Sequence, residues 1–207
     1  MLKRTTGRLL LSLLVITGLA GTSNVNSLSK EERKYALGLM KETYKEVLKS
    51  VKGLSEEQLS FKAAPDKWSV KDCIYHIAAT EKGLWGMLEG IMKSPANPEK
   101  RTEIKMTDEQ LVNMIKDRSA KFKTSEPFEP KNTGYKSIDD ALADFKMTRT
   151  AHIKYMKTST EDMRNHVAQM PLGSLDAYQL YIFIAAHSNR HTQQMNEVKT
   201  SAGFPAK

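Results

Sequence analysis

The sequence predicts an all-α protein, a four-helix bundle with an additional short helix. Apolar residues recur at helical spacing in five separate stretches. Several of these stretches follow a serine or threonine that has an acidic or amide residue three positions later, which is typical of a helix start. Strand-like alternation is not found over any useful length. The chain has 207 residues, of which 40% are hydrophobic and 27% charged, so it can bury one ordinary core.

The first helix is expected to begin after Ser29, because Ser29 and Glu32 form a capping box in which each side chain bonds a free backbone N–H group. Its apolar residues are Tyr35, Leu39, Met40, Tyr44, Val47 and Leu48. The helix is predicted to reach about Val51 and to end at Gly53. Residues 54–67 then form a connection, with one helical turn over residues 56–58.

A second helix is expected after Ser69, with Asp72 at its third position, and it should stop before Pro95. It carries Val70, Cys73, Ile77, Glu81, Leu84 and Leu88 at helical spacing. Residues 97–106 are polar and predict a loop. Thr107 then opens a shorter helix, whose apolar stripe is Leu111, Met114, Ile115 and Phe122.

The segment 124–134 contains two prolines and a glycine and is predicted to be a loop. The next helix opens at Ser137 and carries the apolar residues Ile138, Leu142, Phe145 and Met156. Residues 162–173 are expected to be irregular. The last helix is predicted to start at Ser174 or Leu175 and to run to about Thr200.

The N-terminus resembles a secretory signal peptide, with a basic start, an apolar stretch over residues 9–16 and small residues at Gly18 and Ala20. The domain organisation expected is a signal peptide at 1–20, a linker at 21–29, the helical bundle at 30–201 and a tail at 202–207. The apolar stretch is shorter than the ~20 residues of a membrane span, so export is favoured over an uncleaved anchor. The mature protein would then be secreted or periplasmic.

Cleavage after Ala20 would lower the net charge from +8 to +5, because three basic and no acidic residues are removed. The remaining lysines are interleaved with acidic residues, and no arginine-rich run is present. A nucleic-acid partner is therefore not expected.

Three of the five histidines lie in two apolar helices. On the last helix, five residues spaced four, three, four and three positions apart form one continuous seam that faces inward. They are Leu180, Ile184, His187, His191 and Gln194. His76 lies on or near the apolar side of the second helix. A buried imidazole needs a hydrogen bond or a metal. If the two helices pack together, three neutral nitrogens can hold one divalent metal and leave coordination positions open; the alternative is a set of hydrogen-bonded core histidines.

Other polar residues in these helices are weaker candidates. Glu81 could act as a base or orient a ligand, or form an ion pair on the helix surface. Gln194 could orient a ligand or a bound water, although ordinary polar packing explains it equally well. His152 suits a core or surface role, and His166 is expected to be solvated. Cys73, the only cysteine, cannot form an internal disulfide and is expected to be a buried thiol rather than a ligand or nucleophile.

Two motifs together resemble those of the DinB/YfiT-like family. They are the segment Pro65-Asp66-Lys67-Trp68-Ser69-Val70-Lys71-Asp72 followed by His76, Ile77 and Glu81, and the H-x-x-x-H-x-x-Q pattern from His187 to Gln194. The resemblance extends from about Lys30 to Lys199. It implies a four-helix bundle in which three histidines hold a divalent metal, and by motif these are His76, His187 and His191. Relatives in that family include thiol-dependent S-transferases and a maleylpyruvate isomerase.

The sequence thus predicts an exported metalloprotein, a hydrolase or transferase that uses zinc or nickel on a small-molecule substrate. One alternative is a non-catalytic binding module of the cell envelope, with a structural metal or none. Another is a thiol-dependent S-transferase. The sequence leaves open whether the protein forms a homodimer.

Overall fold

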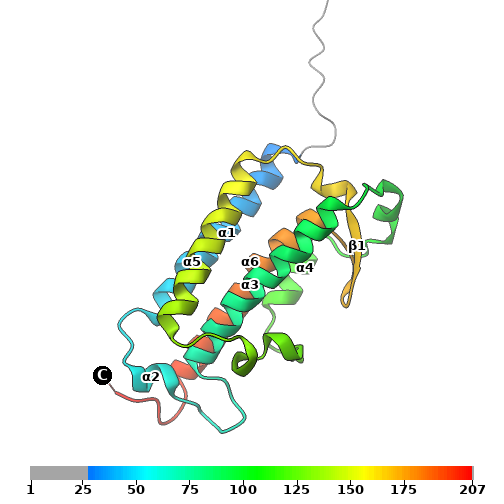
Figure 1. The fold of residues 1–207 in the computed structure, drawn as a ribbon. Coiled ribbons are helices and arrows are strands. Elements are labelled where there is room, and N and C mark those ends of the chain that lie inside the picture. Colours follow the sequence, from blue (N-terminus) through cyan, green and yellow to red (C-terminus); the bar gives the residue numbers. More distant parts are fainter. Residues whose placement is uncertain (1–27, 207) are drawn as a thin grey trace, which may run out of the picture.

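Four long helices enclose the core of the protein. The computed structural model describes residues 28–206, and its long helices are α1 (Lys30–Val51), α3 (Val70–Lys93), α5 (Ile138–Thr158) and α6 (Ala177–Lys199). Helices α1 and α6 run in one direction and α3 and α5 in the other (Figure 1). Each of α1 and α3 packs against both α5 and α6, so the four helices share one core. The predicted all-α bundle is confirmed.

Shorter helical segments occupy the connections. They are α2 (Glu56–Ser60), η1 (Pro98–Glu103), α4 (Asp108–Lys116), η2 (Glu126–Phe128), η3 (Pro130–Asn132) and η4 (Met163–Asn165). Helix α2 contains the helical turn predicted between the first two long helices. Helix α4 is the predicted shorter helix, and it packs against α6.

Local capping fixes where the helices begin. The capping boxes predicted at Ser29, Ser69 and Thr107 are all present, with each hydroxyl accepting from the backbone N–H three residues on. Gly53 follows α1 with φ of 74°, a conformation that a residue with a Cβ adopts poorly. The Ser69 cap fixes the start of α3, the helix that carries His76.

A two-stranded hairpin leads into α6, at the opposite end of the bundle from α2 (Figure 1). Strand β1 (Val167–Met170) pairs antiparallel with β2 (Gly173–Asp176). The predictions of an irregular segment and of a last helix starting at Ser174 or Leu175 are therefore wrong: α6 starts at Ala177, after the Asp176 cap. Four-residue strands are too short to show alternation.

The short helix α4 also ends earlier than predicted, at Lys116 rather than beyond Phe122. Two sets of contacts stabilise this end: the Asp117 side chain accepts from the backbone N–H of Ser119 at 2.8 Å, and the guanidinium of Arg190 on α6 donates to the carbonyls of Ile115, Asp117 and Ala120. Phe122 instead lies against the Arg190 guanidinium, with 4.9 Å between its ring centroid and Arg190 Cζ, and its side chain is half exposed.

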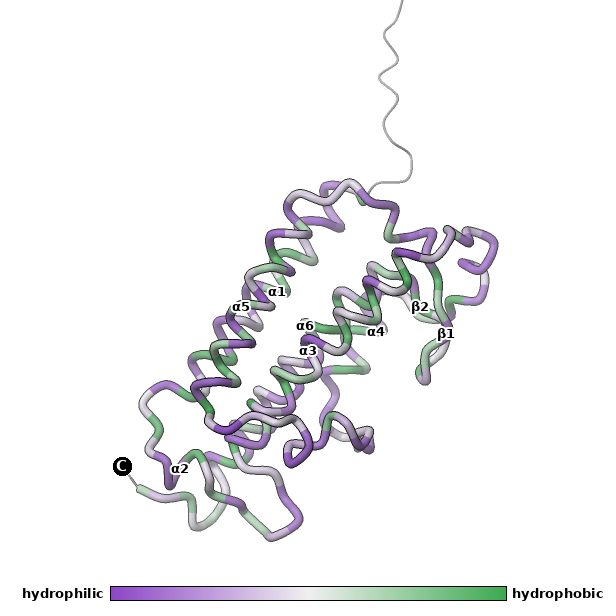
Figure 2. The backbone as a smooth tube through the Cα atoms, in the orientation of Figure 1, coloured by the Kyte–Doolittle hydropathy of each residue, from purple (hydrophilic) through white to green (hydrophobic). Residues whose placement is uncertain are grey.

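Apolar side chains form two clusters between the helices, and the alternation of apolar and polar residues along each helix is visible in Figure 2. The predicted C-terminal tail packs on α2 as far as it is described. Phe204 meets Phe61 edge to face at 5.5 Å, and Gln58 donates to the carbonyl of Pro205 at 2.9 Å.

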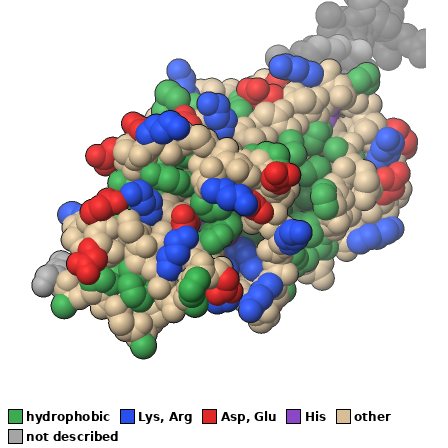
Figure 3. All heavy atoms as spheres, turned by 60° about the horizontal axis from the view of Figure 1, so that its bottom comes forward, with side chains coloured by type: hydrophobic (Ala, Val, Ile, Leu, Met, Phe, Trp, Pro, Cys, Tyr) green, Lys and Arg blue, Asp and Glu red, His purple; other side chains and the backbone are tan. Residues whose placement is uncertain are grey.

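The predicted signal peptide, residues 1–20, lies outside the described residues. Among residues 28–206, none of the helices combines the length and the apolar character that a membrane span requires. Figure 3 shows basic and acidic side chains interspersed over one face of the molecule.

Candidate metal centre

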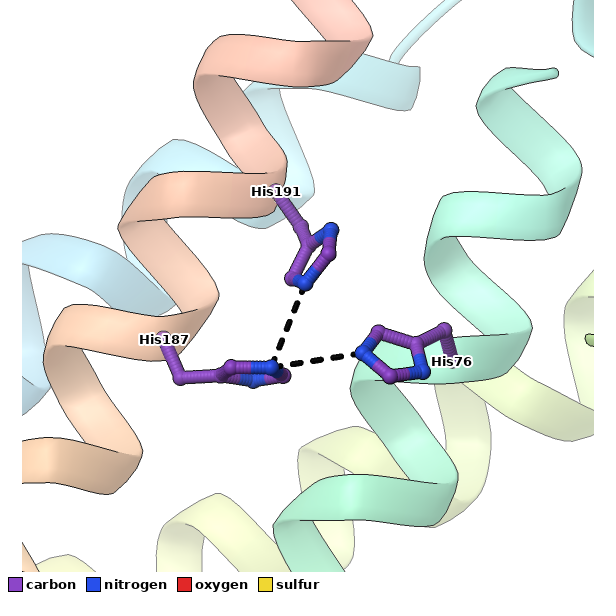
Figure 4. A group of neighbouring side chains, drawn as sticks. All are labelled: His76, His187 and His191. Carbon is purple, nitrogen blue, oxygen red and sulfur yellow. Dashed lines mark hydrogen bonds between the residues drawn. The ribbon is translucent and has the colours of Figure 1, made fainter. Parts of the chain in front are cut away.

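The packing of α3 against α6 brings the three predicted histidines together (Figure 4). His187 and His191 lie one turn apart on α6, and His76 faces them from α3. The Nε2 atom of His187 is 3.2 Å from Nε2 of His76 and 3.2 Å from Nε2 of His191. One nitrogen from each of the three side chains lies within 4.8 Å of the other two.

Hydrogen bonds on the outer side of the cluster fix the protonation of two rings. His76 Nδ1 is 2.7 Å from the carbonyl oxygen of Phe128, which can only accept, so the proton is on Nδ1. His191 Nδ1 is 2.9 Å from Oε1 of Gln194, which also accepts. Each of these rings therefore presents an unprotonated Nε2 to the centre of the cluster.

The third ring follows the same pattern. Thr80 donates its hydroxyl proton to the carbonyl of His76 at 2.7 Å, so its oxygen is free to accept. His187 Nδ1 lies 3.4 Å from that oxygen and can donate to it. In the tautomer of His187 that carries its proton on Nδ1, three Nε2 lone pairs face one another.

A cation between three converging lone pairs satisfies all of them at once, so this donor set fits a metal. A divalent ion at 2.0–2.1 Å from each imidazole nitrogen would separate those nitrogens by about 2.9–3.4 Å. The two separations of 3.2 Å from His187 Nε2 fall in that range, and the His76 and His191 nitrogens lie within 4.8 Å of each other. The three histidines can therefore hold a divalent metal.

Burial keeps the imidazoles neutral, as metal ligands must be. It lowers the pKa of His76 to about 4, against the opposing effect of its bond to Phe128. Burial, together with its histidine neighbours, also holds the pKa of His187 and of His191 well below the usual value. Protons therefore do not compete for the lone pairs at neutral pH.

Aromatic rings form part of the surroundings. Trp68 stacks on His191 with ring centroids 5.7 Å apart and also contacts His76 at 4.9 Å. Phe183 lies parallel to His187 at 6.0 Å. These rings replace water beside the imidazoles, which accounts for much of the burial.

Comparison with known proteins agrees with this architecture. The family model described as the DinB superfamily matches residues 39–195. The chain belongs to the DinB superfamily. The resemblance predicted from the two histidine motifs is thereby confirmed.

Two relatives of this DinB-superfamily chain come from Bacillus subtilis. The uncharacterised protein YuaE (strain 168) is 26% identical over 166 residues, which cover 79% of this chain and 96% of YuaE. The structure of YfiT, described as a probable metal-dependent hydrolase with an unusual four-helix bundle topology, superposes with a TM-score of 0.59. It is 14% identical and covers 86% of this chain and 92% of YfiT, a likeness that shows the fold.

Glu81 does not contact the three histidines of the cluster and instead forms a buried ion pair with Arg149. Both its oxygens accept from Arg149 at 2.6 Å, and one also contacts Nδ1 of His152 at 3.0 Å. Burial would raise the pKa of Glu81, but Arg149 and His152 outweigh it and hold that pKa below its usual value. The ion pair is buried rather than on the helix surface, and Arg149 links it to Ser188, next to His187.

The remaining candidates have structural places. Gln194 contacts His191 and so orients a ring of the cluster. Cys73 is fully buried, which raises the pKa of its thiol, as expected of an inert core residue.

His166 is half-buried, with Nδ1 3.2 Å from the carbonyl of Ile91, rather than solvated as predicted. His152 lies in the core, stacked on Trp85.

Two partners of the histidines were not predicted from the sequence. Phe128 contributes a main-chain carbonyl, which no side-chain pattern reveals. Thr80 lies one turn after His76 on α3, and this spacing was the available signal for its role.

Proposed function

We propose that the protein is a metal-dependent enzyme of hydrolase type that acts on a small molecule. The observation that carries the proposal is the convergence of three Nε2 atoms on rings whose Nδ1 atoms each lie within hydrogen-bond distance of an acceptor. Three protein ligands leave coordination positions open, as in catalytic rather than structural sites. A divalent metal bound there supplies Lewis-acid chemistry and activates a nucleophile at neutral pH.

Each residue of the site has a defined task in this proposal. His76, His187 and His191 hold the metal as neutral ligands. The Phe128 carbonyl and the Gln194 side chain orient two of the rings and make their nitrogens more basic. We propose zinc or nickel, because imidazole nitrogens suit both ions.

The description of YfiT as a probable metal-dependent hydrolase supports this reading, since the two chains share their fold. The buried surroundings of the histidines support it as well, because a water-poor site strengthens the electrostatic effect of a metal. Glu81 is less suited to act as a base, because both its oxygens are already paired. Gln194 is proposed to act on the metal only through His191.

We also propose that residues 1–20 are a signal peptide and that the mature protein is exported. The basic start, the apolar stretch and the small residues before position 21 support this proposal. Mass spectrometry of the protein recovered from the cell envelope or the culture medium tests it. A mature N-terminus near residue 21 is expected, whereas an intact N-terminus on intracellular protein would contradict it.

Hydrolysis of a panel of ester, amide and phosphoester substrates tests the proposed activity. Zinc-loaded protein should turn over at least one class, and chelation or the double variant His187→Ala/His191→Ala should abolish that turnover. The control is His166→Ala, which removes a histidine outside the cluster and should remain active. Turnover that survives the double variant would contradict the proposal, and so would turnover that requires an added thiol, which would favour S-transfer instead.

A further inference from the structure

Gly83 occupies a special position on α3. It follows His76 by seven residues, which places both on the same face of the helix, about two turns apart. A Cβ atom at Gly83 would lie 2.5 Å from Cζ and 2.6 Å from Cε1 of Phe128. Two later glycines of α3, Gly86 and Gly90, have nothing within 4 Å of such an atom. The ring of Phe128 therefore occupies the space that a side chain at position 83 would need.

Phe128 contacts α3 at two points. Its ring lies on Gly83, and its carbonyl oxygen accepts the Nδ1 proton of His76 at 2.7 Å. The segment that carries Phe128 is the three-residue turn η2, followed at once by the equally short η3. Hydrogen bonds within these turns hold their shape, and the ring on Gly83 adds a side-chain contact that can fix the position of this acceptor against α3.

We propose that Gly83 is a positioning residue of the metal site. By lacking a side chain, it lets the Phe128 ring lie against α3 and thereby holds the Phe128 carbonyl at His76. This inference rests on the proposed metal site. A side chain at position 83 displaces the ring, and the carbonyl moves with it, so His76 loses the partner that fixes its tautomer and orientation.

Zinc affinity of Gly83→Ala, measured by competition with a chromophoric chelator, tests the proposal. Loss of a hydrogen-bond partner behind a ligand weakens metal binding about tenfold or more. The matched control is Gly86→Ala, on the same helix with open space around it, which should bind zinc within about twofold of the parent. Both changes favour the helix, so a difference between them reports the contact with Phe128 rather than helix stability.

A double variant isolates the contact itself. In a Phe128→Ala background the ring is gone, so adding Gly83→Ala should weaken zinc binding no further. Additive losses would show that Gly83 acts without Phe128 and would overturn the proposal. Equal zinc affinities of Gly83→Ala and Gly86→Ala would overturn it too.

The position of the proton on His76 gives a readout that needs no metal. Nitrogen-15 NMR of the metal-free protein should show His76 protonated on Nδ1 in the parent and in Gly86→Ala. Gly83→Ala should shift the ring toward the Nε2–H form. If the parent binds no zinc, the proposed function fails, while this NMR comparison still decides the role of Gly83; unchanged His76 signals in Gly83→Ala would refute it.

Discussion

Replacing Glu81 with glutamine should strongly destabilise the fold, because Glu81 neutralises a cation in the centre of the bundle. The guanidinium of Arg149 has no exposed surface and donates to both oxygens of Glu81 at 2.6 Å. The same guanidinium also donates to the Met40 carbonyl and to the hydroxyls of Thr43 and Ser188. Arg149 thereby joins α5 to α1, α3 and α6.

The magnitude follows from the burial of the charge. Breaking a buried ion pair on one side costs about 3–5 kcal/mol, because the remaining charge cannot reach water. Glutamine keeps one acceptor oxygen, so a loss of about 3 kcal/mol in the free energy of unfolding is expected. Removing both charges in Glu81→Leu/Arg149→Met should cost less than the single change, because no unpaired cation remains.

Urea unfolding of the metal-free protein, followed by circular dichroism, measures these differences. The control is Lys131→Gln, which breaks an exposed ion pair with Glu129 and should leave the unfolding midpoint unchanged. A midpoint for Glu81→Gln close to that of the parent would refute the argument that this pair is a buried structural element.

Three further predictions concern the histidines and the start of α3. Unfolding free energy of the metal-free protein should fall as pH drops below about 6.5, by at most about 1.4 kcal/mol per pH unit for each of His76, His187 and His191. The reason is that the unfolded chain takes up protons there that the folded one refuses. Urea unfolding between pH 7.5 and 5 checks this, and a flat profile would contradict it. Gln194→Ala should weaken zinc binding about tenfold in a chelator competition, because His191 loses the partner that orients it. The control is Gln193→Ala, since Gln193 bonds the Lys116 carbonyl instead and its loss should leave zinc affinity unchanged. Equal affinities of the two variants would count against the orienting role of Gln194. Ser69→Ala should lower the unfolding free energy by about 1 kcal/mol through loss of the α3 cap, and a thermal midpoint identical to the parent's would show that the cap contributes nothing.

Much of the helical layout could be predicted because its signals are local. The capping boxes at Ser29, Ser69 and Thr107 each lie within four residues, and the inward seam through His187 and His191 follows from helical spacing alone. The pairing of His76 with the other two histidines needed the further assumption that α3 packs against α6. That packing is what the structure supplies.

The parts that escaped prediction depend on tertiary contacts. Arg190 bonds the carbonyls at the end of α4 from another helix, a contact that the local pattern around Phe122 does not reveal. Glu81 was assigned to the surface or to catalysis because its cation, Arg149, is 68 residues away on another helix. The acceptor behind His76 is a main-chain carbonyl, which carries no residue signature at all.

Titration of metal-free protein with zinc tests the three-histidine site itself. We expect one tightly bound ion per chain in the parent and in His166→Ala. Each of the single variants His76→Ala, His187→Ala and His191→Ala should lose most of that affinity while remaining folded by circular dichroism. A parent protein that binds no zinc, or single variants that bind zinc as tightly as the parent, would contradict a metal site built from these three histidines.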